Sequence, residues 1–230
     1  MSEPTSLPLL FVLTSHGLTG RTGKPTGYYL PEVTHPLTVL QAAGIPVEFA
    51  SIQGGEPPVD GLDLSDPDNA RYWSDPAFRA AVRQTTALAR VDPARYAGIF
   101  FAGGHGAMWD FPSNQAVHHV TRHIYEAGGI VGAVCHGPAA LVNVTLSNGR
   151  PLVAGRQLAA FTNAEEQAVG LSEVVPFLLA DSLIAQGAQH LPAANWTPQV
   201  VVNGALITGQ NPQSARGVGE ALRDAWIQHL

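Results

Sequence analysis

Cys135 is the only cysteine in the chain, and it stands where residue types and spacing could support nucleophilic chemistry. An apolar run, Ile130–Val134, leads into it, and the Gly137-Pro138 pair that follows is typical of a helix start. The spacing Ala133-x-Cys135-x-Gly137 is that of a nucleophile elbow, a strained turn that presents a reactive side chain. A thiolate is a far better nucleophile than a thiol. We therefore expect the helix start, the backbone N–H groups of the turn and the adjacent imidazole to lower the pKa of this cysteine.

The composition limits the functions that the chain can have. Its 230 residues are 45% hydrophobic, which is enough for a full core, and its net charge is −6. No cluster of Lys or Arg offers a face for nucleic acid or anionic membranes, so small molecules or proteins are the expected partners. Residues 1–8 lack a leader pattern, and no apolar run is long enough to span a membrane. A lone cysteine forms no internal disulfide, so we expect a cytoplasmic protein.

Strand-like and helix-like segments alternate along the chain. The expected buried strands are 9–14, 47–50, 98–101 and 130–134, and the expected helices are 32–43, 75–90, 115–127, 173–186 and 211–229. This alternation predicts an α/β fold with a doubly wound, mostly parallel, flavodoxin-like sheet and helices on both faces. The Asn203-Gly204 pair within 200–207 predicts a small β-hairpin addition.

We expect a single domain over residues 1–230, with two irregular regions. Residues 52–75 are rich in proline and glycine and predict a loop insertion. Residues 148–162 are punctuated by glycines, strand-like and consistent with a second hairpin. Ligands of such folds bind at the carboxyl ends of the strands. Both the glycine-rich turn at 103–106 and the Cys135 turn are expected there.

Three motifs carry a resemblance to a known family. They are FAGGHG at 101–106, WDFP at 109–112 and GAVCHGP at 132–138. Supporting stretches lie at 27–32, 50–58, 161–166 and 201–212. Over nearly its whole length the chain resembles the ThiJ/PfpI superfamily, whose members are similar to class I glutamine amidotransferases. More narrowly, it resembles the branch of glutathione-independent glyoxalases and heat-shock-associated chaperones.

The resemblance implies a Cys-His-acid set at the elbow. The family histidine that follows the cysteine is His136 here, and the acid that orients it matches Glu166, with Glu165 as the alternative. The family acid beside the sulfur matches Glu32. Such a carboxyl group shares a proton with the thiol and acts as general acid and base only if a partly dry pocket raises its pKa.

Other groups near the two turns complete the candidate site. The backbone N–H groups of Gly104 and His136 are candidates for an oxyanion site, since two such donors stabilise a carbonyl oxygen under attack. His105 either lines the same pocket and binds substrate or is an ordinary turn histidine. His119 and His123 are four residues apart on a helix, but no third ligand is evident. We therefore expect surface histidines there and no metal site.

The resemblance and the residue inventory together predict a cysteine-dependent, glyoxalase-type lyase. Cys135 adds to the aldehyde of a 2-oxoaldehyde such as methylglyoxal, Glu32 and His136 move protons through an enediolate, and water releases the 2-hydroxy acid. No redox cofactor or glutathione is needed, because the hydride equivalent moves within the substrate.

Alternative functions also fit the sequence. They are a stress chaperone or protein deglycase, and a cysteine peptidase or amidase. A glutamine amidotransferase fits less well, because its catalytic histidine is remote from the cysteine whereas His136 is adjacent. Family members commonly form homodimers, so the expected partners are a small aldehyde and a second copy of the chain.

Overall fold

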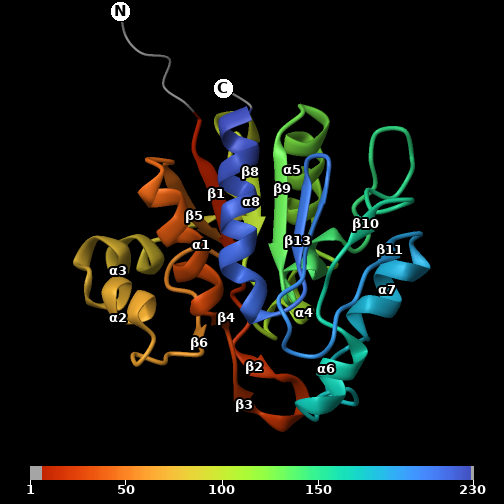
Figure 1. Cartoon of the computed structure of the whole chain (residues 1–230), viewed down its shortest axis with the longest axis horizontal. Coiled ribbons are helices and arrows are strands. Elements are labelled where there is room, and N and C mark those ends of the chain that lie inside the picture. The colour runs from red at the N-terminus through yellow and green to blue at the C-terminus, as the bar shows by residue number, and fades with distance from the viewer. Residues whose placement is uncertain (1–6, 229–230) are drawn as a thin grey trace, which may run out of the picture.

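The computed structural model describes residues 7–228, and its central feature is a seven-stranded sheet (Figure 1). The strands are β1 (Leu9–Leu13), β5 (Val47–Ser51), β7 (Thr86–Ala87), β8 (Gly98–Phe101), β9 (Ile130–Val134), β12 (Val200–Asn203) and β13 (Leu206–Gly209). Their order is β12-β13-β9-β8-β1-β5-β7, and every neighbouring pair is parallel except β12 with β13. The predicted mostly parallel α/β sheet is confirmed.

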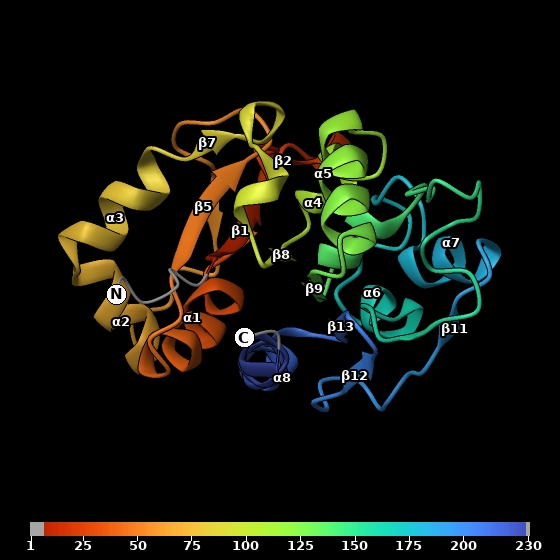
Figure 2. The same ribbon diagram turned by 90° about the horizontal axis from the view of Figure 1, so that it is seen from above.

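Helices cover both faces of this sheet (Figure 2). Helices α1 (Pro31–Ala42) and α8 (Ala215–Gln228) pack together on one face, and α5 (Gln115–Glu126) lies on the other. Successive side chains of a strand point to opposite faces. In β1, Phe11 therefore joins the core beneath α1 and α8, whereas Val12 joins the core beneath α5.

Shorter elements connect these layers. The remaining helices are α2 (Pro67–Ser74), α3 (Pro76–Arg83), α4 (Ala107–Asp110), α6 (Asn163–Ala168) and α7 (Leu179–Ala185). The 3-10 helices are η1 (Gly20–Thr22), η2 (Leu88–Arg90), η3 (Pro93–Arg95), η4 (Gly137–Leu141) and η5 (Pro212–Ser214). Three two-stranded sheets pair β2 (Leu18–Thr19) with β3 (Lys24–Pro25), β4 (Tyr28–Tyr29) with β6 (Val59–Asp60), and β10 (Gln157–Leu158) with β11 (Gln189–His190).

Two expectations in the first half of the chain are wrong. The segment 52–75 is not a plain loop, because it contains β6 and α2. The Asp66 carboxylate accepts hydrogen bonds from two N–H groups of the first turn of α2, and proline fills the first helical position. The helix expected over 75–90 ends at Arg83. There Thr85 exchanges two backbone hydrogen bonds with Gly55, so the chain continues as β7 beside β5.

Three expectations in the second half also need correction. Residues 148–162 form no hairpin, because β10 pairs in parallel with β11 instead. The helix expected from residue 173 begins only at Leu179, beyond Pro176. The helix expected after Cys135 is only the five-residue 3-10 helix η4, because the backbone becomes extended at Val142.

The C-terminal region follows the prediction closely. Strands β12 and β13 form the expected hairpin, whose turn is Gly204-Ala205, with φ of +61° at Gly204. The last helix begins as η5 and continues as α8, and its expected end at residue 229 lies outside the described residues. Within residues 7–228, no helix has the length and hydropathy needed to cross a membrane.

Two turns meet at one edge of the sheet. Strands β8 and β9 are parallel neighbours in which Phe101 lies beside Ala133. The turn 103–106 follows β8 and Cys135 follows β9, so both emerge at the carboxyl ends of the strands. Helix α1 begins at the same edge, because β4 precedes it and the Tyr29 amide donates to the Gly103 carbonyl oxygen at 3.0 Å.

Candidate active site

Cys135 has the strained backbone expected of an elbow. Its φ is +60°, which costs a residue other than glycine on the order of 1 kcal/mol or more. Two hydrogen bonds of 2.9 Å hold this conformation: the Cys135 N–H donates to the Gly209 carbonyl oxygen, and its own carbonyl oxygen accepts from the Phe161 N–H. The turn is therefore fixed between β13 and the segment that leads into α6.

Glycines let the neighbouring turn approach the elbow closely. A Cβ on Gly103 would overlap Glu32 Oε2 and would lie 2.9 Å from the His136 nitrogen. A Cβ on Gly104, whose φ is +99°, would overlap the Gly27 carbonyl oxygen. Among the described residues, no hydrogen bond uses the Gly104 N–H. This donor is consequently available to a ligand beside the elbow.

His136 links the sulfur to a carboxylate. Its Nδ1 lies 3.4 Å from Cys135 Sγ, and its Nε2 lies 2.7 Å from Glu166 Oε2. Burial lowers the pKa of His136 to about 4, with a further contribution from His105, so the imidazole is neutral near pH 7. Burial alone would raise the pKa of Glu166, but the hydrogen bonds from the two imidazoles hold it at about 2.

Glu165 and Glu166 face different surroundings. Glu165 closes a capping box with Thr162 at the start of α6. Its Oε1 accepts three hydrogen bonds, from the Trp196 N–H and the side-chain amides of Gln210 and Asn211. Glu166, and not Glu165, is therefore the carboxylate against His136.

Glu32 lies in the first turn of α1 and is fully buried beside the cysteine. Neither carboxyl oxygen has a well-formed hydrogen-bond partner among the described residues. Burial raises the pKa of Glu32 to about 8, and the facing Cys135 thiol and Gly103 N–H oppose part of that rise. The carboxyl group is thus largely protonated near neutral pH.

The pKa of the Cys135 thiol is raised, contrary to our expectation. Burial disfavours the thiolate, and the Glu32 carboxyl group adds to the rise, while the His136 N–H opposes it. The sequence indicated the N–H groups of the turn but not the dry surroundings or the facing carboxyl group. Cys135 is therefore a thiol near neutral pH.

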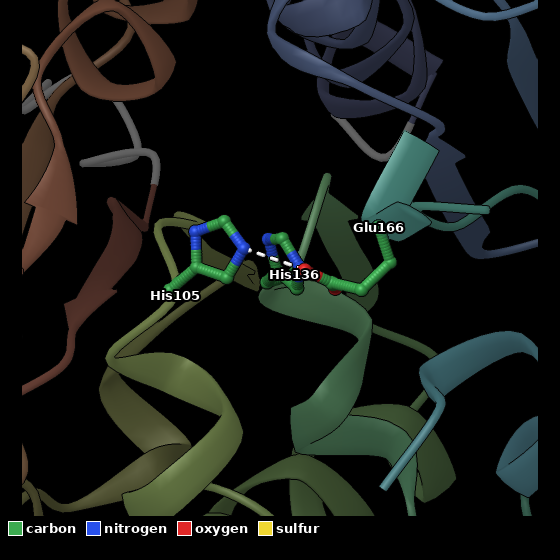
Figure 3. Close-up of side chains that lie close together, drawn as sticks. All are labelled: His105, His136 and Glu166. Atoms are coloured by element: carbon green, nitrogen blue, oxygen red, sulfur yellow. Dashed lines mark hydrogen bonds and ion pairs between the residues drawn. The ribbon is translucent and has the colours of Figure 1, made fainter. Parts of the chain in front are cut away.

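His105 shares the Glu166 carboxylate with His136 (Figure 3). Its Nε2 lies 2.8 Å from Glu166 Oε1, and the two imidazole rings are 4.0 Å apart, centroid to centroid. No signal in the sequence indicated this shared carboxylate. The three side chains could approach a metal ion, since one ligand atom from each lies within 4.8 Å of the others. Their present distances are those of hydrogen bonds. His119 and His123 are both exposed on α5.

A cavity of about 180 Å³ opens over these groups. Five of the predicted site residues line it, namely Glu32, Gly104, His105, Cys135 and His136, whereas Glu166 and its alternative Glu165 do not. Its other six lining residues were not predicted to belong to the site: Tyr29, Asp60, Phe161, Val169, Trp196 and Pro212. A larger groove of about 660 Å³ lies between α1 and α3, but no histidine, cysteine or buried carboxylate lines it. The chemistry of the chain is therefore concentrated at the smaller cavity.

Comparisons with known proteins identify the family of the chain. The family model described as the DJ-1/PfpI family matches residues 26–223. Glyoxalase 3 of Candida albicans is 31% identical over 223 residues, which cover 90% of this chain and 93% of the relative. Glutathione-independent glyoxalase HSP31 of Saccharomyces cerevisiae is 29% identical over 218 residues, covering 88% and 90%.

Solved structures have the same fold. Rapid Encystment Protein 24 kDa of Francisella tularensis matches with a TM-score of 0.93 and 39% identity, over 96% of this chain and 99% of that one. Glyoxalase III of Candida albicans matches with a TM-score of 0.89 and 27% identity, over 96% and 97%. Since the family model spans every residue that lines the cavity, the chain belongs to the DJ-1/PfpI family, as the motifs around Cys135 predicted.

Proposed function

We propose that this protein is a glutathione-independent glyoxalase that converts small 2-oxoaldehydes to 2-hydroxy acids. The observation that carries the proposal is a buried thiol that faces an imidazole and a buried carboxyl group within one small cavity. Two relatives that span most of the chain are named as glyoxalases, which supports the same activity.

The first step is addition of Cys135 to the aldehyde. The thiol proton passes to His136 Nδ1, the acceptor at 3.4 Å, as the sulfur forms a bond to the aldehyde carbon. The carbonyl oxygen gains negative charge, which the N–H groups of Gly104 and His136 stabilise. Return of the proton to this oxygen gives a hemithioacetal. Glu166, held at 2.7 Å, balances the charge of the transient imidazolium.

The second step moves hydrogen from one carbon of the substrate to the next. Glu32 first gives its proton to solvent, and as a carboxylate it takes the proton from the former aldehyde carbon and delivers it to the adjacent carbon. Through the enediolate, His136 passes the hydroxyl proton of the hemithioacetal to the former ketone oxygen. Glu32 then regains its proton from solvent. The product is a thioester of Cys135 with a 2-hydroxy acid. Because both electrons stay within the substrate, neither glutathione nor a redox cofactor takes part. Hydrolysis of the thioester releases the acid, which is lactate when the substrate is methylglyoxal.

The dimensions of the cavity favour a free aldehyde over a polypeptide. About 180 Å³ accommodates a three-carbon oxoaldehyde, whereas a peptide or a glycated protein surface needs an extended groove. The peptidase, amidase and deglycase alternatives therefore find less support. A homodimer and a cytoplasmic location stay predictions; sedimentation of the purified protein tests the first of them.

The proposal is tested by a glutathione-free assay with glyoxal, methylglyoxal and phenylglyoxal. We expect the wild type to form lactate from methylglyoxal and Cys135→Ala to be slower by about 1,000-fold or more, since the nucleophile is lost. Failure of the wild type to form any 2-hydroxy acid, or full activity of Cys135→Ala, would contradict the proposal.

A further inference from the structure

The two histidines that share Glu166 differ in what else they touch. From this difference we propose that His105 is a catalytic base, which activates the water that hydrolyses the Cys135 thioester, whereas His136 serves the sulfur. The inference rests on the proposed function, because it assigns a residue to its last step.

The hydrogen bonds to Glu166 determine the tautomers of both rings. An ionised carboxylate only accepts hydrogen bonds, and its two oxygens meet His105 Nε2 at 2.8 Å and His136 Nε2 at 2.7 Å. Each Nε2 must therefore carry the ring proton. With Nε2 donating to the carboxylate, Nδ1 is the ring atom left to accept a proton.

The surroundings of the two Nδ1 atoms separate the roles. His136 is 1% exposed, and its Nδ1 already faces the sulfur of Cys135. The His105 side chain is 19% exposed and lines the cavity, and its Nδ1 has no hydrogen-bond partner among the described residues. Of the two imidazoles, only that of His105 can offer a free acceptor to a water molecule that enters from solvent.

The remaining carboxyl groups of the cavity are less suited to this step. Glu32 lies beside the sulfur, where its carboxylic acid form, favoured by burial near neutral pH, can give a proton to a leaving thiolate. Asp60 already accepts hydrogen bonds at both oxygens, from the Gly61 N–H at 2.7 Å and from the Thr26 hydroxyl at 3.4 Å.

The hydrolysis balances with these groups. The water oxygen forms a bond to the thioester carbonyl carbon while one water proton passes to His105 Nδ1, and Glu166 at 2.8 Å neutralises the imidazolium. The carbon–sulfur bond then breaks with its electron pair on sulfur, and the Glu32 carboxylic acid protonates the thiolate. The imidazolium returns its proton through solvent to Glu32, and the 2-hydroxy acid leaves.

The test is His105→Gln, assayed with methylglyoxal by rapid quench and intact-protein mass spectrometry. Glutamine can still donate an N–H to Glu166 but has no basic nitrogen. We expect steady-state turnover to fall about 100-fold or more, because the general base is lost. A 2-hydroxyacyl adduct should accumulate on Cys135, and hydroxylamine should release it after desalting, as it does a thioester. Formation of the adduct also shows that the variant folds and completes the earlier steps.

The matched control is His35→Gln. His35 Nε2 also lies 2.8 Å from a carboxylate oxygen, that of Asp66, and its side chain is 21% exposed, but it does not line the cavity. We expect wild-type turnover and no adduct. Wild-type turnover of His105→Gln, loss of activity without an adduct, or accumulation of the adduct in Asp60→Asn instead would overturn the inference. If the wild type itself neither turns over nor acylates, the proposed function fails instead.

Discussion

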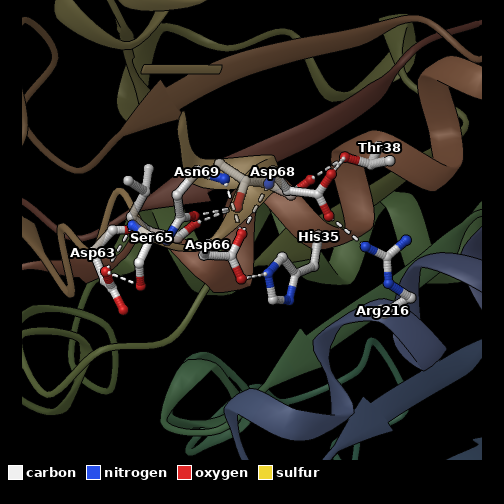
Figure 4. Close-up of polar contacts among 10 residues, drawn as sticks. His35, Thr38, Asp63, Ser65, Asp66, Asp68, Asn69 and Arg216 are labelled. Carbon is white, nitrogen blue, oxygen red and sulfur yellow. Dashed lines mark hydrogen bonds and ion pairs between the residues drawn. The ribbon is translucent and has the colours of Figure 1, made fainter. Parts of the chain in front are cut away.

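Two places in the molecule join a half-buried histidine to a carboxylate at the same distance. His105 meets Glu166 at the cavity, and His35 meets Asp66 between α1 and α2 (Figure 4), each at 2.8 Å. The second oxygen of Glu166 holds another imidazole, whereas the second oxygen of Asp66 accepts two backbone N–H groups at the start of α2. The same kind of pair therefore joins two imidazoles beside the cysteine in one place and caps a helix in the other.

The polar groups around His35 connect helices to one another. Asp68, two residues after Asp66, accepts from the Thr38 hydroxyl of α1 at 3.0 Å and pairs with Arg216 of α8 (Figure 4). The cluster thus ties three helices together. What distinguishes the cavity is the neighbouring thiol of Cys135 and the space beside it, not the histidine–carboxylate contact.

The largest effect should come from Glu166→Gln. An amide cannot accept hydrogen bonds from both imidazoles through two oxygens, so the tautomers of His105 and His136 are no longer fixed together. We expect kcat to fall about 1,000-fold or more, as it does when the acid of a catalytic triad is replaced by its amide. The measurement is steady-state turnover of methylglyoxal. Asp66→Asn is the matched variant; a comparable loss of kcat in Asp66→Asn would break the comparison between the two regions.

Glu32→Gln should reduce kcat less than Glu166→Gln does, and it should increase stability at high pH. We expect kcat to fall about 100-fold, because the proton carrier is lost. The native pKa of Glu32 is about 8 against an ordinary value of 4.5, so between these values the native state binds more protons than the unfolded chain. The Glu32 contribution to the free energy of unfolding therefore falls as pH rises through this window.

Because ionisation of the buried Glu32 destabilises the native state, Glu32→Gln should be more stable than the wild type at pH 8. Removing the buried acid should raise the free energy of unfolding there by about 4 kcal/mol, against less than about 1 kcal/mol at pH 5. Urea unfolding at both pH values measures it. An equal difference at pH 5 and pH 8 would show that the effect does not come from ionisation of Glu32.

The smallest effect is expected at the surface pair. Asp66→Ala removes the cap of α2 and the contact with His35, so we expect a loss of about 1 kcal/mol in the free energy of unfolding with kcat unchanged. Thermal and urea unfolding measure the stability change, and the glutathione-free assay measures kcat. A stability loss well below this value would mean that the cap contributes little to α2.

Local patterns were sufficient to predict much of the fold. The apolar run before Cys135 and the Asn203-Gly204 pair are short-range signals. The strand forms where expected, and the hairpin forms with its turn one residue later, at Gly204-Ala205. The segment 52–75 contains the same kind of signal, because Asp66-Pro67 starts α2 just as Asp75-Pro76 starts α3. The surrounding prolines and glycines obscured it.

The parts of the site that the sequence did not indicate depend on contacts between distant segments. His105 and Glu166 are 61 residues apart, and nothing local shows that one carboxylate holds two imidazoles. The raised pKa of Cys135 likewise depends on how α1 buries Glu32 against the elbow. The residues next to Cys135 predict the turn, but they do not show that the thiol is buried away from water.

The adjacent glutamates of α6 restrict how this chain can change length. Successive residues of a helix point roughly 100° apart, so Glu165 faces the Trp196 loop while Glu166 faces the histidines. Deleting or inserting one residue between Phe161 and Glu166 would rotate α6, so that Glu166 no longer faces the histidines. We therefore expect the segment that joins the elbow to α6 to tolerate substitutions but no insertions or deletions.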